Sequence, residues 1–509
     1  MGEEQVFRDS LQFLTASLEQ LTASLAKTGR ENFYNLHEVV PQIYPESNVE
    51  LLERKGVFCY DYVDSFARLD EPTLPSRAAF FNKIAGVECS EADYAHAQHV
   101  FADFQCENLK DYMKLYLLSD ICLLADVFQM FRNNSLKEYQ LDPAYFVSAP
   151  QLAWNALLKR ITQSIPLITD PEMYRMIQPN IRGGICHASV RSARANNKLM
   201  GSLYDPTKPT SYIMEVDANN LYGWAMSQEM PDGQFEWVSS EECRTMQQTL
   251  KFADRRIAMF DLGIFDHRVL DEKKCFIFEV DLKYPPELHE RDDDYPLAPE
   301  VMIIVPEITG EKQHNLRAKY FGAACPFRRK LICSFLPKKH YVVLGQLRRF
   351  YLDRGMRLVK IHRAIRFNSS PYVAGYIANN MEKRKQFQHD DVKNAFYKLM
   401  NNAPYGKTIN NVTRRTDIRL LNNMEMARRL AEQPHCVDFR VFDGKVAPPE
   451  EQVEAAVVEE QQQEALVGIE MRKLNHFINK PFANGVCVLE YSKLKMYETC
   501  LPLTCLEYY

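Results

Sequence analysis

An alternating apolar run that ends in a carboxylate constrains this chain more than any other feature. Residues 211–217 read SYIMEVD, and ANNLYG follows directly. The alternation predicts a half-buried strand, and the residues after it predict a tight turn into a helix. A strand that delivers Asp217 to its end can hold a divalent cation through hard oxygen ligands. The alternative interpretation is that Asp217 only caps the helix.

A second pattern lies in residues 371–411, which are expected to be mostly helical. Lys398, Asn402 and Tyr405 are spaced i, i+4 and i+7, so they share one helix face. A cation, an amide and an aromatic ring on one face suit a triphosphate, a polar contact and a base. A surface helix with mixed polar residues is the alternative.

A third pattern is the pair Tyr116 and Asp120, four residues apart on a predicted helix over 108–132. A tyrosine that positions water beside a metal-bound aspartate would suit nuclease chemistry. The alternative is a half-exposed tyrosine beside a solvated carboxylate.

Hydrophobic periodicity elsewhere predicts a mixed fold. Residues 28–75 contain several prolines and are expected to be irregular. Residues 448–465 are acidic and glutamine-rich without aromatics, which is typical of a solvated or disordered insertion. The other expected elements are helices over 7–27, 91–104 and 151–161, paired strands over 256–282, and a strand–helix–strand unit over 341–367.

Positive charge is concentrated in one part of the chain. The 509 residues carry a net charge of −5. Residues 311–420, however, hold 24 Lys and Arg against 6 Asp and Glu, a local charge of +18. Such an asymmetry indicates a phosphate-binding surface, with an ordinary solvated surface as the alternative.

Composition excludes several classes of protein. The 13 cysteines include no C-x-x-C pair, which argues against a zinc ribbon and a disulfide framework. No apolar run approaches the roughly 20 residues that span a bilayer, and the first residues show no signal-peptide pattern. We therefore expect an intracellular protein without a membrane partner, and no sorting signal distinguishes nucleus from cytoplasm.

Taken in order, the motifs resemble the protein-primed family B DNA polymerases, and most of all those of Maverick/Polinton-type mobile elements and related viruses. The resemblance extends over nearly the whole chain. It is carried by LYLLSDICLLADVF (115–128), LDPAYFVSAPQLAWNALLK (141–159), IRGG (181–184), DANNLYGWAMSQ (217–228), DYPLAPE (294–300), YVVLGQLRRFYLDRGMRLVKIHRAIRF (341–367) and KLMNNAPYGKT (398–408).

The resemblance implies an α/β (α+β) fold with a polymerase palm and fingers, an inserted subdomain, and an incomplete exonuclease of the ribonuclease H-like type. The thumb is expected to be missing. The implied division is an N-terminal helix and linker (1–50), the exonuclease remnant (51–165), the first part of the palm (180–284), the inserted subdomain (285–370), the fingers (371–425) and the incomplete second part of the palm (426–509).

The resemblance also implies roles at the nucleotide site. Asp217 would be the catalytic metal ligand, and Tyr222 would exclude a ribose 2′-OH above a floor that includes Leu221. Tyr222 would itself form part of that floor together with Leu221. Lys398 would hold the triphosphate. The other implied nucleotide contacts are Asn402, Tyr405, Gly406, Arg384 and Lys385, with Lys383 beside them.

Further implied roles concern DNA. Arg182, Gly183, Gly184 and Lys407 would contact DNA, and Tyr116 with Asp120 would be the third exonuclease motif. The implied reaction is template-directed addition of a dNTP, started on a protein hydroxyl, with Mg²⁺ or alternatively Mn²⁺. The implied partners are primer–template DNA, dNTP and a terminal priming protein.

Departures from the family pattern lead to a further expectation. Residues 1–60 contain no Asp-x-Glu, and no Tyr-x-Asp-Thr-Asp segment follows residue 408. We therefore expect a chain truncated at both ends and impaired as a polymerase. A DNA-binding remnant of a mobile element, a residual exonuclease and a truncated gene model are the alternatives. Pro404 is expected to disturb the fingers helix, at a cost of about 3 kcal/mol.

Overall fold

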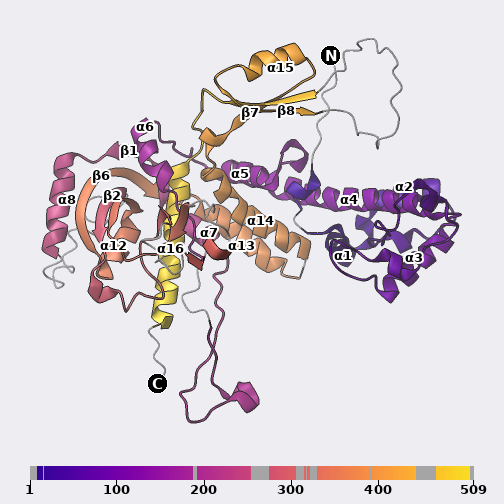
Figure 1. Ribbon diagram of the computed structural model, residues 1–509, viewed down its shortest axis with the longest axis horizontal. Helices are drawn as coiled ribbons and strands as arrows, with labels where there is room; N and C mark the ends of the chain where they lie inside the picture. Colours follow the sequence, from indigo (N-terminus) through magenta and orange to yellow (C-terminus); the bar gives the residue numbers. More distant parts are fainter. Residues whose placement is uncertain are drawn as a thin grey trace.

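The computed structural model describes residues 9–14, 16–186, 192–253, 274–304, 315–316, 318–320, 329–389, 391–442 and 466–504. Figure 1 shows a helical lobe at one end, a curved sheet at the other, and helices between them. The predicted acidic insertion, 448–465, lies outside the described residues, as do residues 256–273 of the predicted paired strands.

The N-terminal lobe packs short helices against one long helix. Its helices are α1 (Leu18–Thr28), α2 (Tyr34–Ile43), α3 (Glu91–Asp103) and α4 (Leu109–Tyr139). The buried carboxylate of Asp126 in α4 accepts hydrogen bonds from the backbone N–H groups of Asn35 and Leu36, at 2.7 and 3.1 Å. These bonds satisfy N–H groups of the first turn of α2, which have no partner within the helix.

Two predictions for this lobe are wrong. The helix expected over 7–27 is interrupted, because Ser17 and Gln20 form a capping box that starts α1. Residues 28–75 are not irregular throughout, because they include α2. The helices expected over 91–104 and 108–132 are confirmed, and α4 continues to Tyr139.

An antiparallel sheet forms the opposite end of the molecule. Its strands are β1 (Met230–Trp237), β2 (Lys274–Lys283), β5 (Lys338–Leu344) and β6 (Arg357–Ser370), in the order β1-β6-β2-β5. Helix α12 (Gly345–Asp353) connects β5 to β6 and packs on β2 and β5, so the predicted strand–helix–strand unit is confirmed. The sheet continues across the boundary proposed at residue 285.

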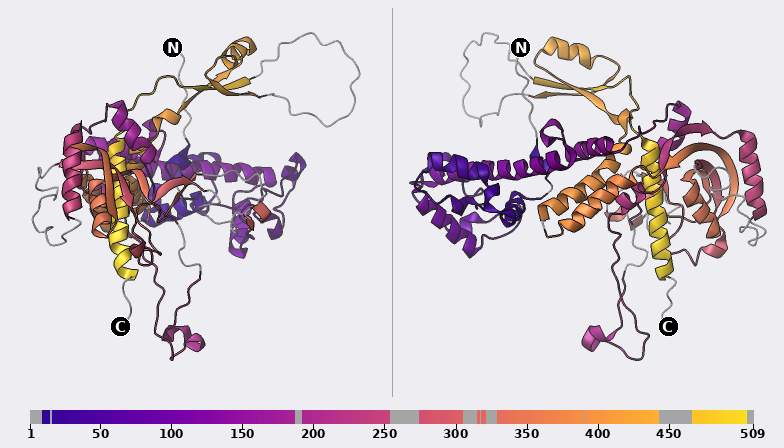
Figure 2. Two further views of the ribbon diagram at one scale, coloured as in Figure 1. Left: turned by 60° about the vertical axis from the view of Figure 1, so that its left-hand side comes forward. Right: turned by 180° about the vertical axis from the view of Figure 1, so that it is seen from behind.

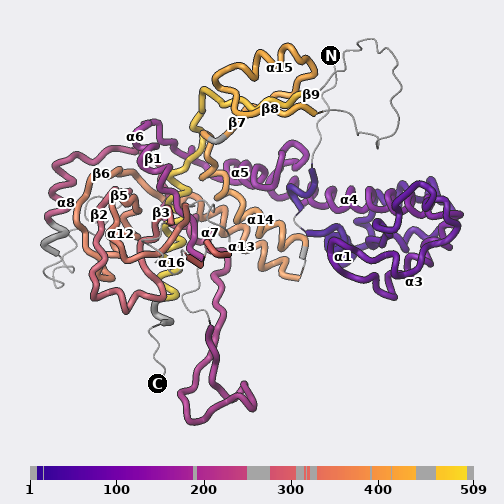
Figure 3. Tube along the Cα trace, in the orientation of Figure 1, coloured from indigo at the N-terminus to yellow at the C-terminus, as the bar shows by residue number. Residues whose placement is uncertain are grey.

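The remaining elements surround these two regions. Figure 3 follows them along the chain trace. They are α5 (Ala149–Arg160), α6 (Pro171–Ile177), α7 (Leu221–Met226), α8 (Ser240–Ala253), β3 (Glu300–Ile303), β4 (Arg329–Ile332), α13 (Ala374–Gln386), α14 (Asp391–Thr408), β7 (Thr416–Leu421), α15 (Met424–Ala431), β8 (Cys436–Phe442), β9 (Leu466–Arg472) and α16 (Phe482–Thr504). Strands β7, β9 and β8 form a small sheet with α15 on one face. None of the described helices has the length and apolar character needed to cross a lipid bilayer.

Helix α16 connects two hydrophobic cores of the molecule. It packs against α7, α12 and α14, and its residues from Phe482 to Lys493 are all buried. Tyr491 belongs to the core shared with the N-terminal lobe, whereas Tyr497 belongs to the core under the large sheet. A helix buried on every side has no amphipathic period, so the sequence pattern did not predict it.

The strand predicted over 211–217 is absent from the structure. Ser211 makes one isolated bridge to Asn196, and residues 212–217 belong to no strand or helix. The apolar side chains of this segment are 52–65% exposed, namely Tyr212, Ile213, Met214 and Val216. The chain before it projects from the body in both views of Figure 2. Alternation indicates which faces a strand can bury, but it does not supply the partner strand.

The expectation that Pro404 disturbs its helix is also wrong, because α14 continues through it. Proline has no N–H group to donate to the carbonyl of Met400, four residues earlier. The buried hydroxyl of Tyr376 in α13 donates to that carbonyl instead, at 2.9 Å. A side chain of the neighbouring helix therefore replaces the missing backbone hydrogen bond.

Tyr376→Phe is expected to lower the free energy of unfolding by about 1–3 kcal/mol, because it leaves the buried Met400 carbonyl without this donor. Urea unfolding followed by circular dichroism measures the change. Tyr145→Phe is the matched control, since Tyr145 is 81% exposed. In a Pro404→Ala background, which restores an N–H donor, Tyr376→Phe should cost less. An equal cost in both backgrounds would contradict this account of the bond.

Candidate active site

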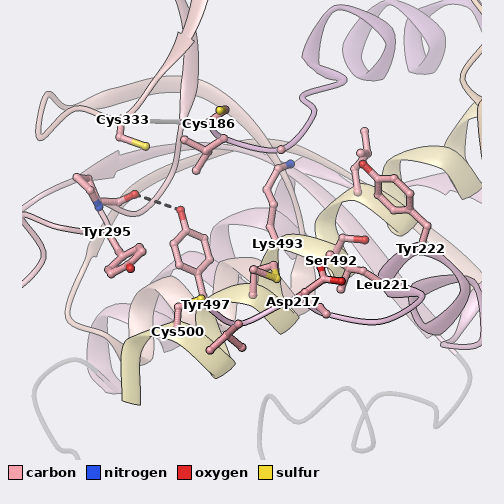
Figure 4. Close-up of a pocket in the computed structure, with 17 residues that line it drawn as sticks. Cys186, Asp217, Leu221, Tyr222, Tyr295, Cys333, Ser492, Lys493, Tyr497 and Cys500 are labelled. Carbon is pink, nitrogen blue, oxygen red and sulfur yellow. Dashed lines mark hydrogen bonds between the residues drawn. The ribbon is translucent and has the colours of Figure 1, made fainter. Parts of the chain in front are cut away.

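A cavity of about 630 Å³ lies beside the predicted metal ligand, Asp217. Asp217, Leu221 and Tyr222 line it on one side, and Ser492, Lys493 and Tyr497 line it from α16. Figure 4 shows these side chains around the cavity, where the hydroxyl of Tyr497 donates a hydrogen bond to the backbone carbonyl of Pro296. The predicted motif therefore lies at a concave site of the size that small ligands occupy.

The structure brings the two predicted nucleotide-binding segments together. The rings of Tyr222, from α7, and Tyr405, from α14, are stacked with their centroids 4.5 Å apart and their planes 21° apart. Burial raises the pKa of Tyr405, and the neighbouring Tyr222 raises it further. The two rings therefore form an aromatic pair, of which Tyr222 lines the cavity beside Asp217.

The turn before α7 depends on Asn220 and Gly223. Asn220 has a left-handed backbone conformation, with φ of 57°. A Cβ atom at Gly223 would lie 2.2 Å from the Asn220 side-chain nitrogen, so this close approach requires glycine or a shift of Asn220. Both polar atoms of the Asn220 amide are buried without a hydrogen-bond partner among the described residues.

The predicted α14 face divides between the cavity side and solvent. Tyr405 contacts Tyr222, Asn402 is half-buried, and Lys398 and Gly406 are exposed. Lys398 precedes Tyr405 by two turns, about 10 Å along the helix axis. Lys398 does not line the cavity, so a ligand bound there would have to extend out of it to reach this side chain.

The three basic residues at the end of α13 differ in their partners. Lys383 forms an ion pair with Glu138 of α4 at 3.6 Å. Arg384 donates to the side-chain oxygen of Asn394 at 3.4 Å. Lys385 is exposed and has no ion pair within the described part of the chain. Of the three, Lys385 is therefore the most available to an anionic ligand.

The side chain of Arg182 is placed inside the protein. It is 5% exposed, donates to the carbonyl of Val342, and lies 3.9 Å above the ring of Tyr341. In this arrangement the guanidinium is not available to DNA, contrary to the expected contact. Gly183 and Gly184, in contrast, have no atom of a described residue, apart from their chain neighbours, within 4 Å of the Cβ position, and Gly184 lines the cavity.

A buried charge cluster beneath the cavity was missed by the sequence analysis. Glu490 and Lys493 of α16 are 3% and 6% exposed, and they form an ion pair at 2.7 Å. Burial opposes ionisation of Glu490, but the charges of Lys493 and Arg182 hold its pKa below the usual value. Burial lowers the pKa of Lys493, an effect that Glu490 opposes. No local pattern reveals this cluster, because Arg182 is far away in sequence.

The carboxylates near the cavity determine how well it suits a divalent metal. Asp217 is the one carboxylate among the described residues that line it. No group of three or more His, Cys, Asp or Glu in the described ranges could hold a metal ion. Asp292 is buried and bound by Tyr284 and Arg291. The described residues alone do not form a two-metal site, and a bound triphosphate would have to supply further oxygens.

A separate polar cluster surrounds the predicted exonuclease residues in the N-terminal lobe. The ammonium group of Lys55 contacts both the Tyr116 hydroxyl and the Asp120 carboxylate. The hydroxyl of Tyr60 lies 2.7 Å from that of Tyr116. Sequence reasoning found Tyr116 and Asp120 from their helical spacing, but Lys55 and Tyr60 lie on an irregular segment without such a period.

Comparison with solved structures finds the Phi29 DNA polymerase. Its complex with single-stranded DNA has a TM-score of 0.40 and 12% sequence identity, covering 97% of this chain and 57% of that one. Its complex with primer–template DNA and incoming nucleotides has a TM-score of 0.39 and 11% identity, covering 88% and 57%. The chain thus spans 57% of the length of these polymerases.

A comparison with curated proteins finds no match. The family model described as "DNA polymerase type B, organellar and viral" matches residues 4–290 and 350–504, which is most of the chain. These two ranges include both tyrosines of the stacked pair and the whole described part of α16. The chain therefore belongs to the family of type B DNA polymerases, organellar and viral.

Proposed function

We propose that this chain takes part in template-directed DNA synthesis by binding a dNTP in the cavity beside Asp217. The observation that carries the proposal is the stack of Tyr222 on Tyr405 at the edge of that cavity. The order of the motifs favours the protein-primed branch of the family, of the Maverick/Polinton or related viral type. A terminal priming protein is then the further partner that we propose.

The roles that we propose follow from position and chemistry. Asp217 would hold Mg²⁺, or Mn²⁺ in its place, together with triphosphate oxygens, because these hard cations prefer oxygen ligands. The metal supplies charge neutralisation during phosphoryl transfer. Tyr222 and Tyr405 support the sugar and base, with Leu221 and Asn402 beside them. Lys398, Arg384 and Lys385 would meet the phosphates that extend beyond the cavity.

The proposed path of DNA uses backbone as well as charge. Gly183 and Gly184 have neither a left-handed backbone nor a close neighbour, so packing within the described chain does not require glycine there. A glycine pair that leaves space on the cavity side supports close approach of a DNA strand. Lys407, at the end of α14, would contact a DNA phosphate.

Tyr222→Ala tests the proposed nucleotide site. We expect it to weaken Mg²⁺-dependent dNTP binding in the presence of primer–template by about 5- to 150-fold, the range typical of losing one aromatic stack. Isothermal titration calorimetry measures this. Tyr212→Ala is the control, because Tyr212 is 52% exposed and does not line the cavity. Equal binding by the wild type and Tyr222→Ala would exclude this site.

A second candidate function is DNA binding without nucleotide incorporation. It is favoured by the single carboxylate that the described residues contribute to the cavity. Primer extension separates the two functions, because a binding protein retains primer–template without extending it. We do not propose exonuclease activity, since Asp120 is paired with Lys55 and no acidic cluster in the described residues could hold metal there.

A further inference from the structure

The two chain segments that join the small sheet to the rest of the molecule bring three cations together. We call these segments, 407–415 with the end of α14 and 473–481, the neck; Figure 1 shows both connections between the small sheet and the helices below it. One ring nitrogen of His476 lies 3.2 Å from the carbonyl oxygen of Val412, so the two segments are in contact. The neck is therefore a defined part of the fold.

Close packing fixes the lower end of the neck. A Cβ atom at Gly485 in α16 would lie 2.2 Å from Ile409 and 2.5 Å from the hydroxyl of Thr408, so glycine permits the start of α16 to meet the end of α14. The ring of Phe482 packs edge-on against Tyr174, with the centroids 4.8 Å apart. Lys407, just before this contact, and Lys480, just before α16, are consequently held near each other.

Three cations at the neck lack a negative partner. Lys407 and Lys480 are half-buried, and Arg415 is exposed. Burial lowers the pKa of Lys480, and the charges of Arg415 and Lys407 lower it further. Across the described ranges, no ion pair joins any of these three side chains to a carboxylate. Mutual repulsion without compensation makes the cluster favourable for an anion.

Exposed apolar side chains lie beside this charge. Phe477 is 84% exposed and Leu474 is 72% exposed, and both belong to the neck. Arg472 and Lys473, which immediately precede them, are also exposed. A free phosphate would use the cations but not the aromatic ring. Cations interleaved with an exposed aromatic ring are typical of surfaces that bind single-stranded nucleic acid, because every base can stack on the ring.

We infer that the neck binds a single DNA strand, with phosphates on Lys407, Arg415 and Lys480 and a base stacked on Phe477. The inference rests on the proposed function and adds a strand-binding site outside the nucleotide cavity. Lys407 was expected to contact DNA, whereas the other three residues are assigned by the structure. The neck holds this strand where the small sheet meets the helices of the body.

The charge contribution is tested with the full chain and a fluorescein-labelled oligothymidine of about 16 nucleotides. Fluorescence anisotropy is measured between about 50 and 200 mM salt. Each lost phosphate contact lowers the slope of log affinity against log salt by about 0.7. Lys480→Gln should reduce the magnitude of the slope by about 0.7. The triple variant Lys407→Gln/Arg415→Gln/Lys480→Gln should reduce it by about 2. Lys110→Gln, an exposed cation of the N-terminal lobe, should leave the slope unchanged.

The stacking contribution has a separate signature. Phe477→Ala should weaken oligothymidine binding by about 5- to 150-fold and leave the salt slope unchanged. Phe66→Ala is the matched control, because Phe66 is 89% exposed and lies in the N-terminal lobe. Unfolding midpoints equal to that of the wild type confirm that the variants remain folded.

The outcomes distinguish this inference from the proposed function. A wild-type chain without salt-dependent DNA binding would contradict the proposed function itself. A steep wild-type slope that persists in the triple variant would overturn only the neck site. Displacement of the oligonucleotide by inorganic phosphate, but not by chloride of equal ionic strength, would reduce the neck to a phosphate site. If the neck variants lost as much affinity for a duplex of the same length as for the oligothymidine, the preference for a single strand would be overturned.

Discussion

Asp217→Ala is expected to lower the rate of template-directed nucleotide addition by at least about 10²–10³-fold, the usual cost of one lost electrostatic contact in a transition state. Phosphoryl transfer places negative charge on the attacking and leaving oxygens, and bound cations neutralise it. Asp217 is the one carboxylate that the described residues contribute to the cavity. Its removal leaves the proposed Mg²⁺ without a protein ligand there.

Primer extension with Mg²⁺, and then with Mn²⁺, measures this effect. Glu215→Ala is a closely matched control, because Glu215 lies two residues earlier on the same exposed segment and does not line the cavity. We expect slow primer extension even by the unmodified chain, because the described residues contribute only one carboxylate to the cavity. Rapid extension that is insensitive to Asp217→Ala would show that the catalytic centre lies elsewhere.

Glu490→Gln is expected to lower the free energy of unfolding by about 3–5 kcal/mol, because it leaves buried cations without their counter-charge. The carboxylate forms an ion pair with Lys493 at 2.7 Å, and the positive charge of Arg182 also stabilises its ionised form. It also accepts the backbone N–H of Leu344 at 3.4 Å, which ties α16 to the end of β5. Chemical unfolding gives the magnitude.

A surface pair of the same length provides the control. Glu425 and Arg429 of α15 are also 2.7 Å apart, but both side chains are 75% exposed. Glu425→Gln should therefore change stability by no more than about 0–1 kcal/mol. Similar losses in the two variants would show that burial does not determine the strength of the Glu490 pair.

The pH dependence of stability gives an independent check of the same pair. The pKa of Glu490 is lowered in the folded state from an ordinary value of 4.5. Its contribution is therefore fully present above about pH 4.5 and is lost as the pH falls through the folded-state pKa. The wild type should lose stability faster than Glu490→Gln when unfolding is followed from pH 5 downward.

Sequence periodicity predicted the parts of the fold that are determined locally. The helical spacing of Lys398, Asn402 and Tyr405 placed them on one face of α14, and that helix is present. The same period gave α4 with Tyr116 and Asp120. These predictions hold because neighbours along one helix are fixed by its own geometry.

Contacts between distant segments were not predictable in the same way. Lys55 reaches Asp120 across 65 residues, and the backbone N–H of Leu344 reaches Glu490 across 146. Nothing in a local pattern specifies such partners. The prediction of a strand over 211–217 is wrong for a related reason, because a strand forms only when it makes hydrogen bonds to another segment. The resemblance placed Tyr222 and Tyr405 at one nucleotide site, but it did not predict that their rings stack.

The hydrogen bond from Tyr376 to Met400 has a consequence for motion. It inserts a side chain of α13 into the ladder of α14 at the turn where proline leaves a gap. Sliding or separating the two helices would break a buried bond, so they should rotate as a single rigid body. Lys385 at the end of α13 and Lys398 on α14 would then swing through the same angle. We therefore expect a hinge that opens the proposed nucleotide site to lie outside this pair of helices.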